Sequence, residues 1–433
     1  MKVSIFWFRR DLRLVDNHGL SEALKGEYPV LPLFIFDRAI LDDLEDKKDR
    51  RVQFIHEQIH TIKKELETYG SSLYVRYGTV EEVWSKVLES YEVQEVYTNR
   101  DYEPYAKDRD AMVSEFLQSE GITFKDFKDQ CIFERDEILK DDGDPYMVFT
   151  PYSRKWKTKL EEQGGFPTYP VQGEGGNWFH TSSLAIPSLE DMGFEACEEP
   201  DFPANYIYRD LIETYDKTRD YPGQHGTTHL GVHLRFGTMS IRSLARAAKE
   251  LNGTFLNELI WRDFYMMILH HFPKVVNENF NSKYDKIPWR NNEEEFEKWK
   301  EGKTGYPIVD AGMRELNTTG YMHNRVRMIT ASFLTKHLLI DWRWGEAYFA
   351  SKLLDYDLSA NNGGWQWAAS TGTDAQPYFR IFNPYSQTDK FDKDKTYIKK
   401  WVPEFETEDY PEPMVDHKEA RERCLAVFKD VLG

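Results

Sequence analysis

Two tryptophans, Trp365 and Trp367, stand one residue apart and follow Gly363 and Gly364. An ordinary core is filled more readily by Leu or Phe, because a buried Trp needs a partner for its indole N–H. The two glycines allow the backbone to approach a flat group closely. Residues 361–374 therefore predict a binding site for a flat group. The alternative is a tight turn whose aromatic side chains fill a gap in the core.

Two carboxylates, Asp355 and Asp357, precede this stretch. They are suited to pair with Arg327 or to accept hydrogen bonds from the hydroxyl and ring N–H groups of a ligand. A second acidic site lies earlier, where Glu258 is close to Trp261 along a predicted helix. A structural ion pair is the alternative there, because buried charges are rare unless they are paired.

A glycine-bounded turn at residues 226–231 contains Thr227 and Thr228 ahead of a predicted helix. Hydroxyl and backbone N–H groups in such a turn can hold a phosphate. Thr and Gly are also ordinary capping residues before a helix, which is the alternative interpretation.

Composition argues against a membrane or secreted disulfide-rich protein. No apolar run approaches the roughly 18 residues that a membrane span needs, and the N-terminus begins like a strand and not like a signal peptide. Cys131, Cys197 and Cys424 are widely spaced, without a paired metal-ligand pattern. We therefore expect a cytoplasmic protein with neither a disulfide framework nor a metal site.

The formal net charge of -18 is unevenly distributed. Residues 222–400 contain 24 Lys and Arg against 20 Asp and Glu, a net charge of +4, whereas the rest contains 32 against 54. The later part of the chain can therefore bind an anionic partner, while the acidic remainder favours solubility.

The first 130 residues alternate between short apolar runs and helical patterns, as in a doubly wound parallel α/β domain. The near-continuous apolar runs are typical of strands that are covered on both faces. We expect strands at residues 3–8, 30–36, 73–77, 93–98 and 122–127, and helices at residues 51–69 and 80–88.

No glycine-rich dinucleotide fingerprint follows the first strand. That strand leads instead into Arg9, Arg10, Asp11 and Arg13, which we interpret as an internal cluster of ion pairs.

A chain of 433 residues is too long for one ordinary core, so two domains are expected. Residues 141–203 are rich in Gly, Pro, Ser and acidic residues, and we interpret residues 131–204 as an interdomain linker. Residues 205–433 then form an all-helical domain, with helices expected at 240–251, 307–316 and 324–339.

Four stretches together resemble the photolyase and cryptochrome flavoprotein family: residues 6–13, 302–310, 365–374 and 378–384. The resemblance spans nearly the whole chain and is strongest to class I cyclobutane pyrimidine dimer photolyases. It implies light-driven repair of pyrimidine dimers in DNA, in which excited, fully reduced anionic FAD donates one electron to a dimer that has been flipped out of the duplex.

The same resemblance implies an FAD site in the helical domain. Arg327 and Asp355 would form an ion pair that faces the flavin, and Asn324 would face its N5 atom. Relatives commonly carry Ser where this chain has Gly231, which removes one hydroxyl contact and keeps the backbone contacts. The cofactor-binding residues implied are Tyr215, Thr227, Thr228, His229, Leu230, Gly231, Asn324, Arg327, Asp355, Asp357 and Asn361.

For the substrate, Glu258 would bond to the flipped bases and Trp261 and Trp367 would form flat walls. The remaining DNA-binding residues implied are Arg219, Arg262, Arg325, Met328, Arg380 and Lys390. A chain of Trp365, Trp342 and Trp289 would pass electrons to oxidised flavin, so that the catalytic set comprises Glu258, Asn324 and these three tryptophans.

A second, light-harvesting chromophore is expected between the domains, with Arg9, Glu103 and Lys155 as candidate contacts. Family frequency favours folate over deazaflavin, and an empty pocket is the alternative. We further expect a monomer that associates with the nucleoid when it binds DNA.

Two other functions compete with repair. A cryptochrome would share the fold and FAD but would signal; against it, the chain ends soon after the helical domain and keeps Glu258, Trp261 and Trp367. Relatives that repair the pyrimidine-pyrimidone photoproduct carry His in place of Asn324, which disfavours that activity. The missing glycine fingerprint disfavours a nicotinamide-dependent oxidoreductase.

Overall fold

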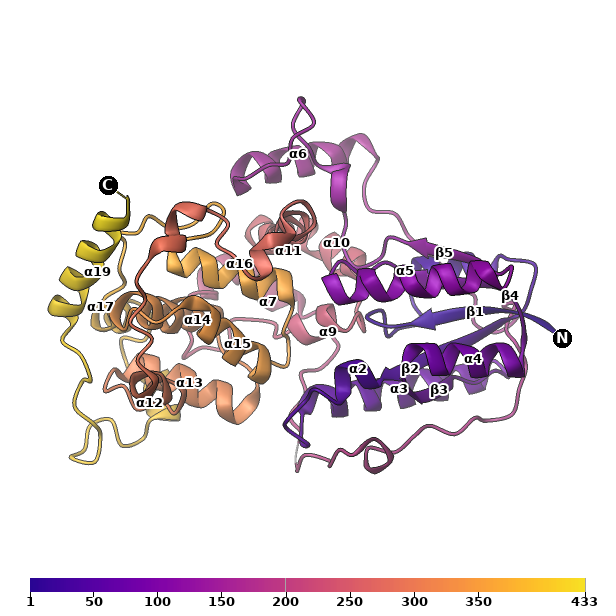
Figure 1. The fold of residues 1–433 in the computed structure, drawn as a ribbon, viewed down its shortest axis with the longest axis horizontal. Helices are drawn as coiled ribbons and strands as arrows, with labels where there is room; N and C mark the ends of the chain where they lie inside the picture. Colours follow the sequence, from indigo (N-terminus) through magenta and orange to yellow (C-terminus); the bar gives the residue numbers. More distant parts are fainter. Residues whose placement is uncertain (199, 433) are drawn as a thin grey trace. The chain divides into compact units, whose positions relative to one another are not determined.

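The computed structural model describes residues 1–198 and 200–432 (Figure 1). The chain forms two compact units, each built from separate stretches of sequence. Unit 1 comprises residues 1–134, 160–206 and 230–247, and unit 2 comprises residues 135–159, 207–229 and 248–433. Parts of the predicted linker, residues 131–204, thus belong to both units.

Unit 1 contains a five-stranded parallel sheet, as the apolar runs predict. Its strands are β1 (Lys2–Phe8), β2 (Val30–Asp37), β3 (Tyr74–Gly78), β4 (Glu92–Asn99) and β5 (Thr123–Phe127). The spatial order is β3-β2-β1-β4-β5, with Trp7 opposite both Leu33 and Thr98. The order reverses between β1 and β4, and ligands of doubly wound folds bind beyond the carboxyl ends of the strands at such a switch point.

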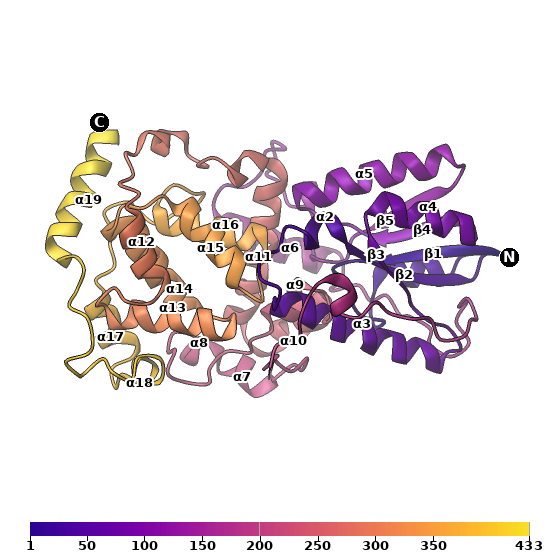
Figure 2. The same ribbon diagram turned by 60° about the horizontal axis from the view of Figure 1, so that its bottom comes forward.

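Helices cover both faces of this sheet (Figure 2). On one face, α4 and α5 pack against Val3, Ile5 and Trp7 of β1 in a single core, where the rings of Trp7 and Trp84 meet edge to face at 5.6 Å. On the other face lies α3. The helices of unit 1 are α1 (His18–Leu24), α2 (Arg38–Leu41), α3 (Arg50–Thr68), α4 (Val80–Ser90), α5 (Pro104–Ser119), η2 (Glu190–Met192) and α9 (Gly231–Arg235).

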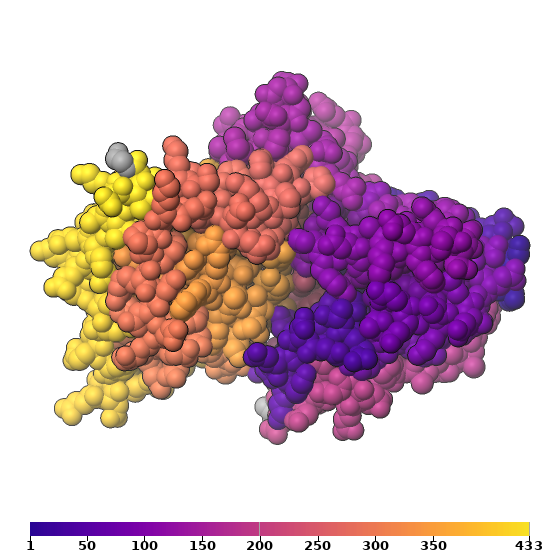
Figure 3. Space-filling view, in the orientation of Figure 1, coloured from indigo at the N-terminus to yellow at the C-terminus, as the bar shows by residue number. Residues whose placement is uncertain are grey.

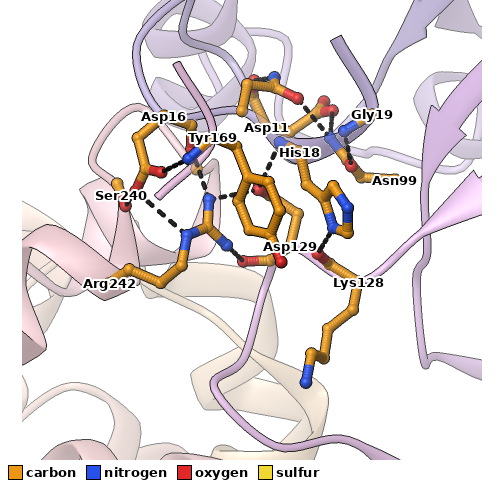
Figure 4. Close-up of polar contacts among 12 residues, drawn as sticks. Asp11, Asp16, His18, Gly19, Asn99, Lys128, Asp129, Tyr169, Ser240 and Arg242 are labelled. Carbon is orange, nitrogen blue, oxygen red and sulfur yellow. Dashed lines mark hydrogen bonds and ion pairs between the residues drawn. The ribbon is translucent and has the colours of Figure 1, made fainter. Parts of the chain in front are cut away.

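A buried ion network joins three distant parts of unit 1 (Figure 4). Asp129 accepts from Arg13 and Arg242, each at 2.7 Å, and Arg242 also bonds to Asp16 at 3.1 Å. Such groups are stable in the interior because each charge has an opposite partner. Arg242 lies on α10 (Ile241–Leu251), so this helix is fastened to the loop after β1.

The charged run after β1 is indeed a cluster of ion pairs. Besides Arg13, Arg10 pairs with Asp101 at 3.1 Å and Arg9 pairs with Asp110. Burial raises the pKa of Asp11 to about 6, although this carboxyl accepts hydrogen bonds.

Unit 2 is helical, as predicted, around a core that includes Trp299, Trp342 and Trp365. Its helices are η1 (Arg135–Glu137), α6 (Phe149–Glu162), α7 (Arg209–Glu213), α8 (Tyr215–Thr218), α11 (Gly253–His271), η3 (Pro273–Val276), η4 (Ser282–Lys286), α12 (Glu293–Lys300), α13 (Pro307–Thr319), α14 (Asn324–Ser332), η5 (Phe333–His337), α15 (Trp342–Lys352), α16 (Leu358–Ala369), α17 (Pro384–Phe391), α18 (Thr396–Trp401) and α19 (His417–Leu432). Helix α6 begins in unit 2 and α10 begins in unit 1. Among the described residues, no helix has the length and apolar character to cross a membrane.

Two local expectations were wrong. The segment 141–203, interpreted as lacking periodicity, contains α6, whose residues Tyr152, Trp156 and Leu160 are buried and recur every four positions. The helix expected at 324–339 changes at Phe333 into the π-helical turn η5, where the buried Lys336 bonds to Ala369 O and Ser370 Oγ. A π turn of this kind often marks a functional region.

The stretch that carries Trp365 and Trp367 is helical, because α16 spans it from Leu358 to Ala369, so the tight-turn alternative is wrong. Its two glycines differ. A Cβ atom at Gly363 would lie 2.3 Å from the ring of Tyr265 on α11, whereas a Cβ atom at Gly364 would meet nothing within 4 Å. Gly363 thus allows α11 and α16 to touch, and Gly364 leaves open space.

We predict opposite effects of alanine at these two positions. Gly363→Ala should lower the free energy of unfolding by about 1–3 kcal/mol, because the new methyl group overpacks Tyr265. Gly364→Ala, the matched control, should be neutral or stabilising by up to about 1 kcal/mol through helix propensity. Thermal unfolding of both variants measures this, and equal melting temperatures would contradict the proposed helix contact.

Candidate cofactor and substrate site

A cavity in unit 2 lies among α14, α15, α16 and the loop before α16. Seven residues predicted to act in binding or catalysis line it, and the complete lining is Asn324, Arg327, Met328, Ala331, Phe349, Leu353, Asp355, Tyr356, Asp357, Ala360, Asn361, Gly364 and Trp365. On the face shown in Figure 3, the orange surface of this part of the chain is bordered by the salmon surface of earlier segments. Residues of α14, α15, the following loop and α16 together line this cavity.

The predicted ion pair between Arg327 and Asp355 is present in this cavity. The guanidinium of Arg327 donates to both carboxylate oxygens of Asp355, at 2.9 and 3.1 Å, and its Nε donates to Met322 O at 2.7 Å. Burial opposes the charge of Arg327, but Asp355 more than offsets this, so the pKa of Arg327 is raised. The pair holds a fixed cation and a fixed acceptor at the cavity wall.

Asn361 contacts a carboxyl group that the sequence did not single out. Its Nδ2 donates to Glu346 Oε1 at 2.8 Å and to Glu346 O at 3.2 Å. Burial raises the pKa of Glu346, and the bond from Asn361 opposes that shift. The amide oxygen is the acceptor of the Asn361 side chain, and it can accept a bond from a ligand while Nδ2 donates to Glu346.

The buried indole of Trp365 carries an unsatisfied donor. Its Nε1 has no hydrogen-bond partner among the described residues, although only 2% of the residue is exposed. An unpaired buried N–H costs roughly 1–3 kcal/mol. This atom is not exposed to the cavity, although the Trp365 side chain forms part of the cavity wall. The Arg327–Asp355 pair, the Trp365 side chain and the open space at Gly364 fit a polar, flat cofactor such as FAD.

The three tryptophans of the predicted electron chain share one hydrophobic cluster. The ring of Trp365 meets Trp299 at 6.0 Å and Phe349 at 4.9 Å. Trp342 is buried and donates to Asn279 Oδ1 at 2.8 Å, while Trp289 is half-buried at the edge.

The predicted phosphate-holding turn is divided between the two units. Tyr215 and residues 227–229 belong to unit 2, whereas Leu230 and Gly231 belong to unit 1. Within unit 2, Thr227 Oγ1 lies 3.3 Å from the Tyr321 hydroxyl, and the His229 ring stacks on Tyr321 at 4.0 Å. Burial lowers the pKa of His229, which favours the neutral imidazole.

Glu258 and Arg219 form an ion pair, with Nη1 of Arg219 2.5 Å from the carboxylate. Burial raises the pKa of Glu258 above its ordinary value of 4.5, and Arg219 opposes that shift. Arg325 pairs with Asp220 at 2.7 Å. The two cations are therefore held close to where α11 and α14 begin, and a phosphate could replace either carboxylate.

The two aromatic walls expected for the substrate lie on adjoining helices. Trp261 is half-buried on α11, and Trp367 is half-buried on α16. Trp365 and Trp367 are about 200° apart around α16, since an α-helix has 3.6 residues per turn. Trp365 is buried within the hydrophobic cluster of unit 2, whereas Trp367 is half-buried and packs against the same cluster, so Trp367 is the more accessible of the two.

The other predicted contacts are more exposed. Asn324 is exposed at the rim of the cavity, where its Nδ2 approaches Met328 Sδ at 3.9 Å, and Arg262 is half-buried on α11. Arg380 and Lys390 are exposed on the segment that follows α16. Exposed cations suit contacts with a phosphate backbone, which position DNA without reading its sequence.

A second cavity of about 180 Å³ lies in unit 1, beyond the carboxyl ends of β1, β2 and β4. Arg9 and Glu103, two of the predicted contacts of the second chromophore, both line it, and Trp7 forms part of its wall. The guanidinium groups of Arg9 and Arg109 lie 4.9 and 5.0 Å from the Trp7 ring. Lys155, the third predicted contact, belongs to unit 2 and lies 3.3 Å from Asp141.

Comparison with known proteins agrees with this geometry. A family model described as DNA photolyase matches residues 4–171, and one described as FAD binding domain of DNA photolyase matches residues 255–409. A protein of Halobacterium salinarum named deoxyribodipyrimidine photo-lyase is 38% identical, with 100% of both chains covered.

The chain belongs to the photolyase/cryptochrome family. Two solved structures of this family resemble it closely. The class III photolyase of Agrobacterium tumefaciens has a TM-score of 0.86 and 32% identity, and covers 100% of this chain and 98% of its own. The photolyase of Sulfolobus tokodaii with two FAD molecules has a TM-score of 0.82 and 35% identity, with 99% and 100% covered.

The sequence patterns did not indicate several residues that contact the predicted site residues. Glu346 accepts a hydrogen bond from Asn361, which lies 15 residues later in the chain. Phe149 stacks on Trp261, which lies much farther along the chain. The helical stripe of Tyr152, Trp156 and Leu160 was the one signal that could have shown that the segment around Phe149 is ordered.

The Arg219–Glu258 pair predicts a pH-dependent stability. In the Arg219→Met variant the attraction that lowers the pKa of Glu258 is lost, so this pKa rises further above 4.5. A carboxyl whose folded pKa is raised stabilises the fold at low pH, and this contribution is lost as the pH rises through that pKa. The melting-temperature difference between wild type and Arg219→Met should therefore be larger at pH 8 than at pH 4.

The double variant Arg219→Met/Glu258→Gln is the control, because it has no carboxyl left to titrate at this position. Its melting temperature should follow the pH profile of Glu258→Gln. An equally steep loss of stability in the double variant would show that the pH dependence arises elsewhere.

Proposed function

We propose that this protein is a deoxyribodipyrimidine photolyase, which uses light to repair cyclobutane pyrimidine dimers in DNA. The observation that carries the proposal is the cavity of unit 2, where Trp365, Asn361 and the Arg327–Asp355 pair meet. The family membership and the name of the Halobacterium salinarum relative, which aligns from end to end, support the same activity.

FAD is the cofactor in this proposal. When bound, reduced and excited by light, it supplies one electron to the dimer and receives it back after the ring has opened. Arg327 provides a positive charge that favours an anionic flavin, and Asp355 and Asn361 Oδ1 accept bonds from its N–H groups. Residues 215 and 227–231 bind the phosphates and the sugar-alcohol chain, and Asn324 faces the flavin from the rim.

Trp365, Trp342 and Trp289 keep the cofactor reduced in this proposal, because they deliver electrons from the surface to the oxidised form. Their membership of one cluster supports the idea. Trp365 is the nearest of the three to the cofactor, since it lines the cavity.

The substrate side of the site binds DNA and holds the dimer. Arg219, Arg262, Arg325, Arg380 and Lys390 contact phosphates, while Glu258 bonds to the flipped bases and Met328 lines their cavity. Trp261 and Trp367 replace the base stacking that the dimer loses. A dimer is poorly stacked, so its extrusion costs less than the few kcal/mol that intact bases need, which provides selectivity.

The cavity of unit 1 is the proposed site of the second chromophore. Trp7 offers a flat wall, and the lining contains arginines beside Asp37, Asp101 and Glu103, which can bond to the polar groups of a ligand. We retain folate as the expected chromophore; a flavin is the alternative, because the Sulfolobus tokodaii relative contains two FAD molecules.

We further propose a cytoplasmic monomer that associates with the nucleoid through DNA.

The decisive test is light-dependent repair. Protein purified with its flavin, chemically reduced and mixed with dimer-containing DNA, should restore intact pyrimidines under blue or near-ultraviolet light and not in the dark. Glu258→Ala should reduce the yield. Flavin binding without repair would favour a cryptochrome-type signalling protein, and protein that does not take up FAD would overturn the whole proposal.

The role of Trp365 is tested separately. Trp365→Phe should abolish photoreduction of oxidised flavin, followed by absorbance under blue light, because phenylalanine is much harder to oxidise. Repair by chemically reduced enzyme should remain largely intact. Trp299→Phe, which changes the ring neighbour of Trp365 outside the predicted chain, is the control and should photoreduce normally. Loss of repair and photoreduction together in Trp365→Phe would contradict separate roles.

A further inference from the structure

Phe149, at the start of α6, stacks on Trp261 of α11. Their ring centroids are 3.7 Å apart and the ring planes differ by 5°, although the residues are far apart in the sequence. Phe149 is 9% exposed, and its ring also meets Phe264 edge to face at 6.0 Å. One face of the Trp261 indole is therefore covered by another residue of the same unit.

The backbone around Phe149 is fastened to the loop that follows α16. Phe149 N donates to Asp374 Oδ2 at 3.1 Å, and Thr373 Oγ1 donates to Met147 O at 2.7 Å. Thr373 and Asp374 come a few residues after Trp367 on the same stretch of chain. A chain of direct contacts thus leads from the Trp261 ring to the loop beyond Trp367.

The body of α6 is fastened to α11 by two further bonds. Trp156 Nε1 donates to Asp263 Oδ2 at 2.9 Å, and Lys157 Nζ donates to Asn257 Oδ1 at 2.8 Å. Asn257 and Asp263 lie on either side of Trp261 along α11. The position of Phe149 is therefore set by contacts with α11 itself and does not depend on the stacking alone.

An aromatic side chain binds a stacked base more tightly when its orientation is already fixed before the base arrives. A half-buried indole can rotate about its side-chain bonds, and that freedom is lost when a base stacks on it, which weakens binding. A stacked aromatic partner restricts the rotation before binding and contributes about 0.5–1.5 kcal/mol beyond its buried area. Phe149 covers one face of Trp261, and Tyr265 lies against the same indole at 5.5 Å with 30° between the ring planes. A further planar group can therefore stack only on the part of the indole that these two rings leave open.

We propose that Phe149 is a positioning residue, which orients the Trp261 indole for a flipped base and couples it to the loop after Trp367. The proposal assigns a function to the start of α6, which neither the sequence motifs nor the family resemblance identified. It rests on the proposed function for the role of Trp261 as a substrate wall. The ordering of Trp261 by Phe149 is independent of that function.

The first measurement concerns Trp261 alone, without cofactor chemistry or light-driven repair. Phe149→Leu removes the ring and keeps an apolar side chain, so the near-ultraviolet circular dichroism of Trp261 should decrease. The same substitution in a Trp261→Leu background should have no such effect. Phe149→Tyr restores a flat partner without adding a second indole, so it should recover the signal in the long-wavelength tryptophan band. An unchanged spectrum in Phe149→Leu would overturn the ordering role.

The second measurement is the affinity for DNA in the dark. Phe149→Leu should weaken binding of dimer-containing DNA by about two- to tenfold, as expected for one lost aromatic pair. Binding of undamaged DNA should change less than twofold, because the phosphate contacts remain. Phe296→Leu, which removes a half-buried Phe stacked on Trp299 in the same unit, is the matched control and should leave both affinities unchanged.

A double-variant comparison separates positioning from general packing. If Phe149 acts through Trp261, the combined Phe149→Leu/Trp261→Leu variant should bind dimer-containing DNA no more weakly than Trp261→Leu alone. Additive losses would mean that Phe149 only supports the fold, and would reject the proposal. The melting temperatures of all variants identify any that fold poorly, and Phe149→Tyr then provides the comparison.

The outcomes also distinguish this inference from the proposed function. If Trp261→Leu leaves the affinity for dimers unchanged, Trp261 is not a substrate wall and the proposed site is wrong. If Trp261→Leu weakens binding but Phe149→Leu does not, the site stands and the positioning role fails.

Discussion

The close contact between α11 and α16 is the constraint on which the candidate site depends. Gly363 permits it, since any larger residue would overlap the ring of Tyr265. The contact places Glu258 and Trp261 on one helix beside Trp365 and Trp367 on the other. Because Trp365 is buried and Trp367 is half-buried, one helix offers both a buried and a more accessible indole.

Both units contain buried ion pairs in addition to their apolar cores. In unit 1, Asp129 and Asp16 are paired with arginines, and in unit 2, Arg327 is paired with Asp355. A pair of this kind seldom adds much stability over a well-packed apolar pair, but the loss of one partner is costly. These pairs therefore define which loops must meet, while the apolar clusters supply most of the favourable free energy.

Sequence patterns predicted the sheet of unit 1 and the helical character of unit 2, because strand and helix periodicities are local. They missed α6, whose stripe of Tyr152, Trp156 and Leu160 is surrounded by loop-like composition. The ion pair between Arg327 and Asp355 was predicted from the opposite charges of these residues and from the family resemblance. The contacts of Asn361 with Glu346 and of Trp261 with Phe149 depend on tertiary packing, and residue spacing does not encode such contacts.

The ion network around Asp129 has a consequence for how unit 1 is made. Its sheet is complete at residue 127, but Arg242, which neutralises Asp16 and Asp129, is synthesised much later. At about 5–20 residues per second, the ribosome needs roughly 6 to 23 s to extend the chain from residue 127 to Arg242. During that time Asp129 can already pair with Arg13, but Asp16 lacks the partner that Arg242 supplies, so the loop after β1 gains its full set of ion pairs only after α10 has been made. An isolated fragment of the first 130 residues would remain in that unfinished state.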